Sequence, residues 1–187
     1  MTVVANPKPA GVAARIQRLL LSPRTEWEAI DVEPATEGSV LGYAGLLAAI
    51  PSVAYLTGRL VWTGDALSAV SGAIVSYVLM LVLTYAAALV VDGFAPAFEI
   101  GRDRVRALKL VVYSLTPYWL AGVLFVRFTL YAFSWLAGLY AFILIFLGVP
   151  RLMKVEGEKA VVYSIVAMIA VGLAFNLAEW ALWRAWW

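Results

Sequence analysis

Five long apolar stretches alternate with short polar segments along this chain. They contain no charged residue, and they run over Val40–Gly58, Ala66–Val91, Leu110–Val126, Phe128–Val149 and Ala160–Ala178. A helix that crosses the hydrocarbon core of a bilayer needs about 20 apolar residues, with a working range of roughly 17–25. The pattern therefore predicts an all-α polytopic membrane protein with five transmembrane helices.

The first 39 residues follow a different pattern. Val12, Ile16 and Leu19 recur at helical spacing with Arg15 and Arg18 beside them, which predicts a short basic amphipathic helix before the first span. Such a helix can lie in the membrane interface or pack on the cytoplasmic face of the protein itself, and the pattern leaves both open. We expect residues 1–39 to be a cytoplasmic segment with amphipathic helices and residues 40–187 to be the transmembrane domain.

A second short helix is predicted after Ser22, which can cap a helix that begins at Pro23. Trp27 and Ile30 share one face of this helix. The acidic residues that follow it are interpreted as a solvated linker: Asp31, Glu33 and Glu37.

The boundary between the third and fourth spans is the least defined. Residues 110–149 would make about 60 Å of continuous helix, which is enough for two crossings. The one charge in this stretch is Arg127. We predict a tight hairpin there, with Arg127 reaching to the outer interface. The alternative is an arginine buried against a carboxylate partner.

The basic residues are distributed unevenly between the loops. In an N-terminus-in topology, every Lys and Arg except Arg59, Arg127 and Arg184 lies on the cytoplasmic side. Short cytoplasmic loops carry an excess of Lys and Arg in membrane proteins. The charges therefore predict a cytoplasmic N-terminus and a C-terminus on the opposite side.

Composition agrees with a membrane domain and excludes several chemistries. The chain is 64% hydrophobic and 14% charged, against about 25% charged in ordinary globular proteins. It has no Cys and no His, so thiol nucleophiles, thiolate metal sites and imidazole bases are excluded. Its net charge of +2 is too small to indicate nucleic acid. We expect no catalytic residues, no cofactor and no metal, and a protein that is not an enzyme.

Two sets of residues are candidate sites. Five arginines are candidates for binding a partner protein or lipid: Arg15, Arg18, Arg102, Arg104 and Arg106. A solvated helix whose charges pair with one another is the alternative interpretation of the last three. Six residues are candidates for a polar pathway between the helices: Asp92, Tyr113, Ser114, Pro117, Arg127 and Glu179. Proline-broken helices can line such a pathway, although hydroxyls also bond within a helix bundle.

Small residues recur on the second span at Ser68, Gly72 and Ser76. This spacing lets helix backbones approach closely. We expect it to serve packing within the bundle, with homo-oligomer formation as the alternative.

Three segments resemble the Yip family, the five-span membrane proteins named for interaction with Rab-type GTPases. They are residues 20–30 (LLSPRTEWEAI), residues 113–117 (YSLTP), and Leu147-Gly148-Val149 followed by Lys159-Ala160. The chain looks like a prokaryotic member, and the resemblance covers about Leu19 to Ala174. It implies a cytoplasmic N-terminus, a role in membrane organisation or trafficking, and the bacterial cytoplasmic (inner) membrane as the location.

One departure from the family pattern limits what the resemblance implies. Eukaryotic members carry an Asp-Leu-Tyr-Gly-Pro motif before the first span, and this chain lacks it. Asp92-Gly93-Phe94-Ala95-Pro96 is only a loose echo at a different place, so GTPase binding is not carried over. The hypothesis is a non-enzymatic scaffold or adaptor that recruits a partner or lipid at its cytoplasmic face. The alternative is a small transporter or channel.

Overall fold

The computed structural model describes residues 11–127, 130 and 133–186, and for residues 178, 179 and 181–186 it describes the backbone alone. Lys8 of the predicted cytoplasmic segment and Phe128, the first residue of the fourth predicted span, lie outside the described residues. Its elements are α1 (Val12–Leu21), α2 (Pro23–Val32), α3 (Glu37–Thr63), α4 (Ala66–Phe94), η1 (Ala95–Phe98), α5 (Arg104–Ser114), α6 (Thr116–Ala121), η2 (Gly122–Val126), α7 (Ser134–Leu152) and α8 (Gly157–Trp186).

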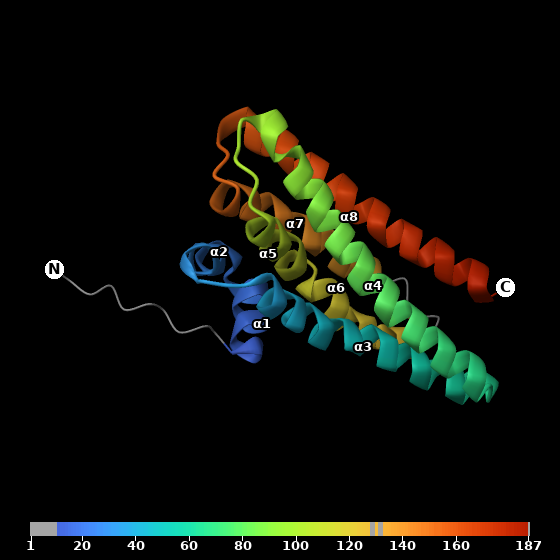
Figure 1. Ribbon diagram of the computed structural model, residues 1–187. Helices are drawn as coiled ribbons and strands as arrows, with labels where there is room; N and C mark the ends of the chain where they lie inside the picture. The colour runs from blue at the N-terminus through green and yellow to red at the C-terminus, as the bar shows by residue number, and fades with distance from the viewer. Residues whose placement is uncertain (1–10, 128–129, 131–132, 187) are drawn as a thin grey trace.

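Five segments of the described chain are helical, long and apolar enough to cross a membrane. They are Glu37–Thr63, Ala66–Phe98, Arg104–Val126, Ser134–Leu152 and Gly157–Leu177. Each overlaps one of the apolar stretches of the sequence, and two short helices precede them (Figure 1). The predicted fold class is confirmed.

Local side-chain contacts determine where the spans begin. Thr36 and Ser39 form a capping box at the start of α3, each side chain accepting the other's backbone N–H. Gly64 ends α3 with a φ of 69°, a conformation that glycine adopts without steric cost. Asp65 then caps α4 through Ser68 N, and Asp103 caps α5 through Arg106 N.

The third span is the centre of the bundle. Of its most apolar window, 67% is buried, against 33–44% for the other four. Its α5 part packs on α3, α4 and α7, and the ribbon places it between them (Figure 1). The span changes from α5 to α6 at Leu115, two residues before Pro117, which has no N–H to donate to a preceding carbonyl.

The small residues of α4 face α3. Ser76 Oγ lies 3.4 Å from Ser52 Oγ, and Arg59 donates to Ser68 Oγ at 3.1 Å. Gly72 between them is buried. The prediction that this spacing serves packing within the bundle is confirmed.

The third and fourth spans separate at Arg127, as predicted, but by a longer connection. η2 ends at Val126 and α7 begins at Ser134, so the connection is not a tight hairpin. Trp62 at the end of α3 holds its start by donating Nε1–H to Val126 O at 3.3 Å. The exposed Arg127 guanidinium lies 5.6 Å from the centroid of the Trp62 ring.

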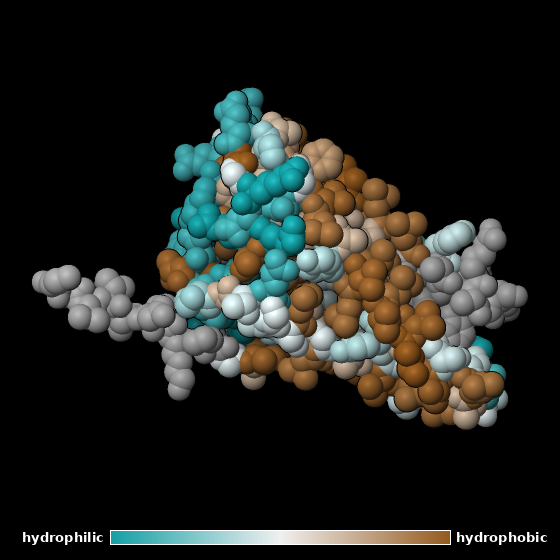
Figure 2. Space-filling view, viewed as in Figure 1, coloured by the Kyte–Doolittle hydropathy of each residue, from teal (hydrophilic) through white to brown (hydrophobic). Residues whose placement is uncertain are grey.

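One end of the bundle is strongly polar, and the visible surface beyond it is mostly apolar with smaller polar patches (Figure 2). Ion pairs between described residues of different elements gather at this end, among them Glu28–Arg151, Asp31–Lys154, Glu37–Arg104 and Glu99–Lys159. We call this the polar end. The Trp62–Arg127 contact lies at the opposite end of α3.

Gly58 should be the most sensitive glycine of α3. A Cβ there would lie 2.6 Å from Val126 O, a backbone atom that cannot rotate away. We expect Gly58→Ala to lower the free energy of unfolding by about 1–3 kcal/mol, measured by denaturation in detergent micelles. Gly42→Ala on the same helix is the control, since nothing lies within 4 Å of its added Cβ. Equal effects of the two substitutions would contradict the packing of α3 on η2.

Candidate functional site

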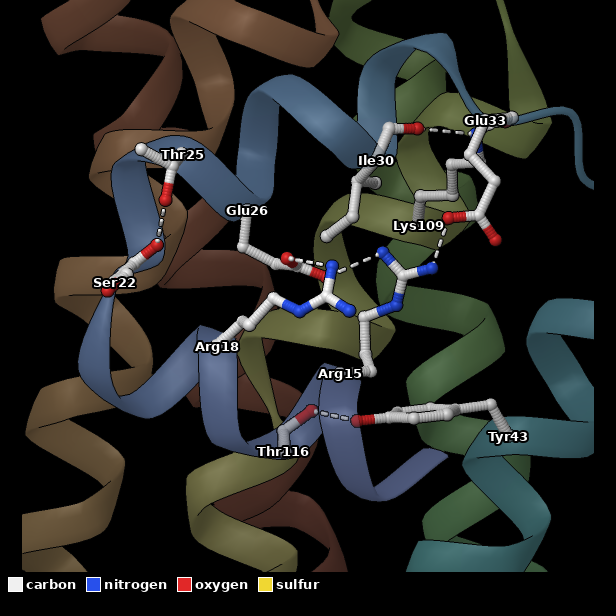
Figure 3. Close-up of polar contacts among 10 residues, drawn as sticks. All are labelled: Arg15, Arg18, Ser22, Thr25, Glu26, Ile30, Glu33, Tyr43, Lys109 and Thr116. Carbon is white, nitrogen blue, oxygen red and sulfur yellow. Dashed lines mark hydrogen bonds and ion pairs between the residues drawn. The ribbon is translucent and has the colours of Figure 1, made fainter. Parts of the chain in front are cut away.

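The candidate site is a buried ion network at the polar end, where the hairpin formed by α1 and α2 meets α5 (Figure 3). Arg15 of α1 donates from Nη1 to Glu26 Oε1 of α2 at 2.9 Å, and from Nη2 to Glu33 at the end of α2. The side chains of Arg15 and Glu26 are 3% and 1% exposed. The arginine therefore joins both ends of α2 from inside the protein.

The two carboxylates keep the buried guanidinium charged. Burial opposes the charged form of Arg15, but the hydrogen bond to Glu33 and the negative charges of Glu33 and Glu26 outweigh it, so the pKa of Arg15 is raised. Arg18 adds a second cation, with Nη1 3.5 Å from Glu26 Oε2. Glu26 is thus held between two arginines.

Lys109 of α5 connects the C-terminal end of α2 to the bundle by hydrogen bonds. Its Nζ donates to the carbonyl oxygens of Ile30 at 2.8 Å and Glu33 at 2.6 Å. These carbonyls belong to the C-terminal turn of α2, where helical carbonyls lack partners within the helix and attract cations. Lys109 therefore caps α2 from another element of the fold.

Aromatic and hydroxyl groups line the side of the network that faces the bundle. The centroid of the Tyr113 ring lies 5.1 Å from Cζ of the Arg15 guanidinium. The Tyr43 ring packs edge-on against the Tyr113 ring, with 5.0 Å between the two centroids. Tyr43 Oη lies 2.9 Å from Thr116 Oγ1, within hydrogen-bond distance (Figure 3). The network thus continues as neutral polar contacts between the first and third spans.

Apolar packing supports the same docking. Trp27 and Ile30 share one face of α2, as predicted, and the structure shows that both are buried. Trp27 packs against Gly148 of α7, where an added Cβ would lie 2.9 Å from the indole ring. A bulkier residue at Gly148 would push the hairpin away from the bundle.

The interpretation of Asp31, Glu33 and Glu37 as a solvated linker is wrong. Asp31 pairs with Lys154, Glu33 with Arg15, and Glu37 with Tyr85 and Arg104. They are held because basic residues of three other segments lie opposite them: Arg15 of α1, Arg104 at the start of α5 and Lys154 just after α7. The N-terminal segment is therefore docked on the bundle along its length from α1 to α3.

The loop before α5 is only partly paired with itself. Arg106 Nε lies 3.1 Å from Asp103 Oδ2, as the sequence spacing allowed. Glu99 pairs instead with Lys159 at 2.7 Å, because residues 100–103 are not helical. The hydrogen bond and positive charge of Lys159 hold the pKa of Glu99 below its usual value.

The structure separates the five candidate arginines. Arg15 lies inside the ion network and is closed to an external ligand, whereas Arg18 is half-exposed. Arg102 and Arg104 are exposed at the polar end, and Arg106 also approaches Leu152 O at 3.5 Å. The predicted apolar face of α1 is also rotated, since Arg15 and Leu19 are the buried pair while Val12 lies exposed.

The pathway candidates do not share one described cavity. Tyr113, Ser114 and Pro117 are buried in the third span, and Asp92 is buried near the end of α4. Asp92 Oδ1 and Ser114 Oγ have no hydrogen-bond partner among the described residues. A cavity of about 300 Å³ between α7 and α8 is lined by other residues, among them Phe146 and Ala160.

Two further pathway candidates lie away from this region. Arg127 is exposed at the opposite end of α3, and its contact there is the Trp62 ring. Glu179 belongs to α8, and its side chain is outside the described residues.

Sequence reasoning missed Glu26, Glu33, Lys109 and Tyr43 as members of one network. A signal was present: Glu26, Ile30 and Glu33 recur at helical spacing on the face that also carries Trp27. A charged side chain on the buried face of a helix is stable only where a side chain of opposite charge lies nearby. The facing residue, Arg15, lies on the buried face of the preceding helix.

The fold and this site define a class, a polytopic α-helical membrane protein with a helical hairpin locked over one end of its bundle. The family model of the Yip1 domain matches residues 18–178. The chain therefore belongs to the Yip1 domain family, and the family resemblance of the sequence is confirmed. Comparison with curated proteins and with solved structures found no match.

Removing one partner of the ion network should loosen the hairpin. We expect Arg15→Met to lower the free energy of unfolding by about 3–5 kcal/mol, because two carboxylates lose their buried cation. Adding Glu26→Gln and Glu33→Gln to the same chain should recover most of this loss. The measurement is denaturation in detergent micelles.

Arg18→Met is the matched control for this experiment. Its half-exposed side chain should contribute under about 1 kcal/mol. If Arg15→Met is as mild as Arg18→Met, the network does not hold the hairpin.

Proposed function

We propose that this Yip1-domain protein is a non-enzymatic scaffold or adaptor that recruits a partner protein at its polar end. We place that end on the cytoplasmic side, because it carries the basic segments that membrane proteins keep inside. We also propose a bacterial cytoplasmic membrane as its location, from the family resemblance of the sequence.

The observation that carries the proposal is the locked hairpin beside exposed basic residues. Arg15 and Lys109 hold α2 in one position, so the polar end is a preformed surface. A preformed surface loses little conformational freedom on binding, which favours recognition of a partner.

The partner should present an acidic surface. Arg102 and Arg104 are exposed, and the nearest carboxylate to Arg104, that of Glu37, lies 4.0 Å away. Arg106 is less available because Asp103 and Leu152 O occupy its guanidinium. Charge complementarity of this kind directs which partner binds and how fast.

Charge reversal at the two exposed arginines, Arg102 and Arg104, tests recruitment. We expect Arg102→Glu with Arg104→Glu to reduce recovery of a crosslinked partner from native membranes by at least about tenfold, as expected for like charges at an interface. Mass spectrometry of the crosslinked products gives the measurement.

Arg127→Glu is the control, because Arg127 is also exposed but lies at the opposite end of α3. Recovery that is unchanged in the double variant, or equally reduced in the control, would contradict recruitment at the polar end.

Transport is the second candidate function, and one observation favours it. Asp92 is 7% exposed within a candidate span, and Oδ1 has no partner among the described residues. Ionisable residues within a membrane often mark the path of an ion or a proton. Ser114 Oγ in the third span is likewise without a described partner.

Reconstituted vesicles can decide between the two functions. If the protein is a transporter, vesicles should show ion or solute flux that Asp92→Asn lowers by at least about tenfold. Asp65→Asn is the control, since Asp65 is an exposed helix cap at the other end of α4. Flux that is absent across a panel of cations, anions and small solutes would exclude this alternative.

A further inference from the structure

We infer that the exposed edge of the α1–α2 hairpin binds anionic phospholipid headgroups at the membrane interface. Leu20 and Leu21 enter the acyl region, and Arg18 and Arg24 contact the lipid phosphates. This site is separate from Arg102 and Arg104, and the inference does not depend on recruitment of a partner protein.

The end of the α1–α2 hairpin nearest to Leu20 lies level with α7. Tyr140 of α7 donates its hydroxyl to the carbonyls of Leu19 at 3.3 Å and Leu20 at 3.0 Å. Tyr140 precedes Leu152, the last residue of α7, by twelve positions, which is about 18 Å of helix. The end of α1 therefore lies beside a membrane-spanning helix.

Contacts to the other spans agree with this level. Arg15 lies over Tyr113, well inside the third span, and Tyr113 in turn contacts Tyr43 of α3. In Figure 1, α1 lies beside the start of α3, while the turn between α7 and α8 lies farther out along the bundle. The end of α1 is therefore level with the acyl chains, whereas α2, whose Glu28 pairs with Arg151, lies nearer to the polar end and its headgroups.

The end of α1 exposes apolar surface at this level. Leu19 is fully buried against the bundle, whereas Leu20 is 37% exposed and Leu21 is 73% exposed. Two adjacent exposed leucines are unfavourable in water and favourable in acyl chains. The outward side of this helix end is therefore suited to lipid.

Two arginines lie close to the turn between α1 and α2. Arg18 is half-exposed, one turn before Ser22, and Arg24 is exposed two residues after it. Arg24 makes no hydrogen bond or ion pair within the described part of the chain. The neighbouring carboxylates are already engaged: Glu26 pairs with Arg15 and, at 3.5 Å, with Nη1 of the half-exposed Arg18, and Glu28 pairs with Arg151.

The combination identifies the occupant. A guanidinium binds phosphate through two parallel hydrogen bonds, and each basic residue near an anionic leaflet contributes about 1 kcal/mol. A soluble phosphate would use the arginines but leave both leucines in water. An anionic phospholipid of the same leaflet satisfies the arginines and the leucines together.

The depth of the hairpin can be measured because the chain has no Cys. A nitroxide label at Leu21→Cys is compared with one at Val32→Cys, which is 65% exposed near the end of α2. In phosphatidylcholine vesicles containing phosphatidylglycerol, the label at 21 should be relaxed mainly by oxygen. The label at 32 should be relaxed mainly by a water-soluble nickel chelate. Equal access of the chelate to both labels would overturn the inference.

Headgroup selectivity is measured with spin-labelled phosphatidylglycerol and phosphatidylcholine in the same vesicles. Wild type should hold phosphatidylglycerol preferentially, and Arg18→Gln with Arg24→Gln should lower that preference by about fivefold for each arginine. Arg102→Gln with Arg104→Gln is the matched control and should leave the preference within about twofold of wild type, because both residues lie outside the hairpin.

Three outcomes of this experiment would overturn the lipid site. The first is an equal loss of preference in the control, which would indicate a nonspecific charge effect. The second is displacement of the lipid by excess inorganic phosphate, which would indicate a soluble ligand. The third is an unchanged preference with loss of a crosslinked partner in the Arg18 and Arg24 variant, which would indicate a protein interface.

Discussion

The buried charge of Arg15 is the constraint on which the polar end depends. A guanidinium that is 3% exposed is stable only where carboxylates lie within reach, and Glu26 and Glu33 supply them from the two ends of α2. Because the three residues come from α1 and α2, their pairing requires the two helices to fold back on each other. Lys109 then ties the end of α2 to the central span. At this end of the molecule, the buried charge of Arg15 is therefore neutralised only when α1 and α2 are docked in this arrangement.

The opposite end of α3 is held by close backbone packing and an aromatic contact. Gly58 lets the backbone of η2 approach α3, and Trp62 bonds to Val126 O and lies under Arg127. Between the two ends, small residues of α4 pack on α3 with few polar contacts. Such packing holds helices together where the surrounding lipid is as apolar as the side chains. The polar end differs in that several ion pairs link elements far apart in sequence, so it can present a fixed surface.

The sequence predicted the spans well and the site poorly, for a physical reason. Apolar length and charge-free runs are local properties, so the span from Ala66 and the break at Arg127 could be read directly. The start of the fourth span at Ser134 could not, because no charge, Gly or Pro marks it in the sequence. Arg15 was read as a surface cation because a single helix does not reveal a partner carboxylate on the next. Tyr113 was noticed as a polar group within a span, but its contact with Arg15 needs the hairpin to be in place.

By itself, the sequence determined that this chain is a bundle of apolar helices with a basic bias on one side and a Yip-type pattern over most of its length. These are consequences of residue type and spacing along the chain. Only the tertiary structure decided that the N-terminal segment is docked, that Arg15 is buried, and that Asp31 pairs with Lys154. Whether a charged side chain meets water or a counter-charge depends on which helix folds against it, and that choice is made by the packing of the whole bundle.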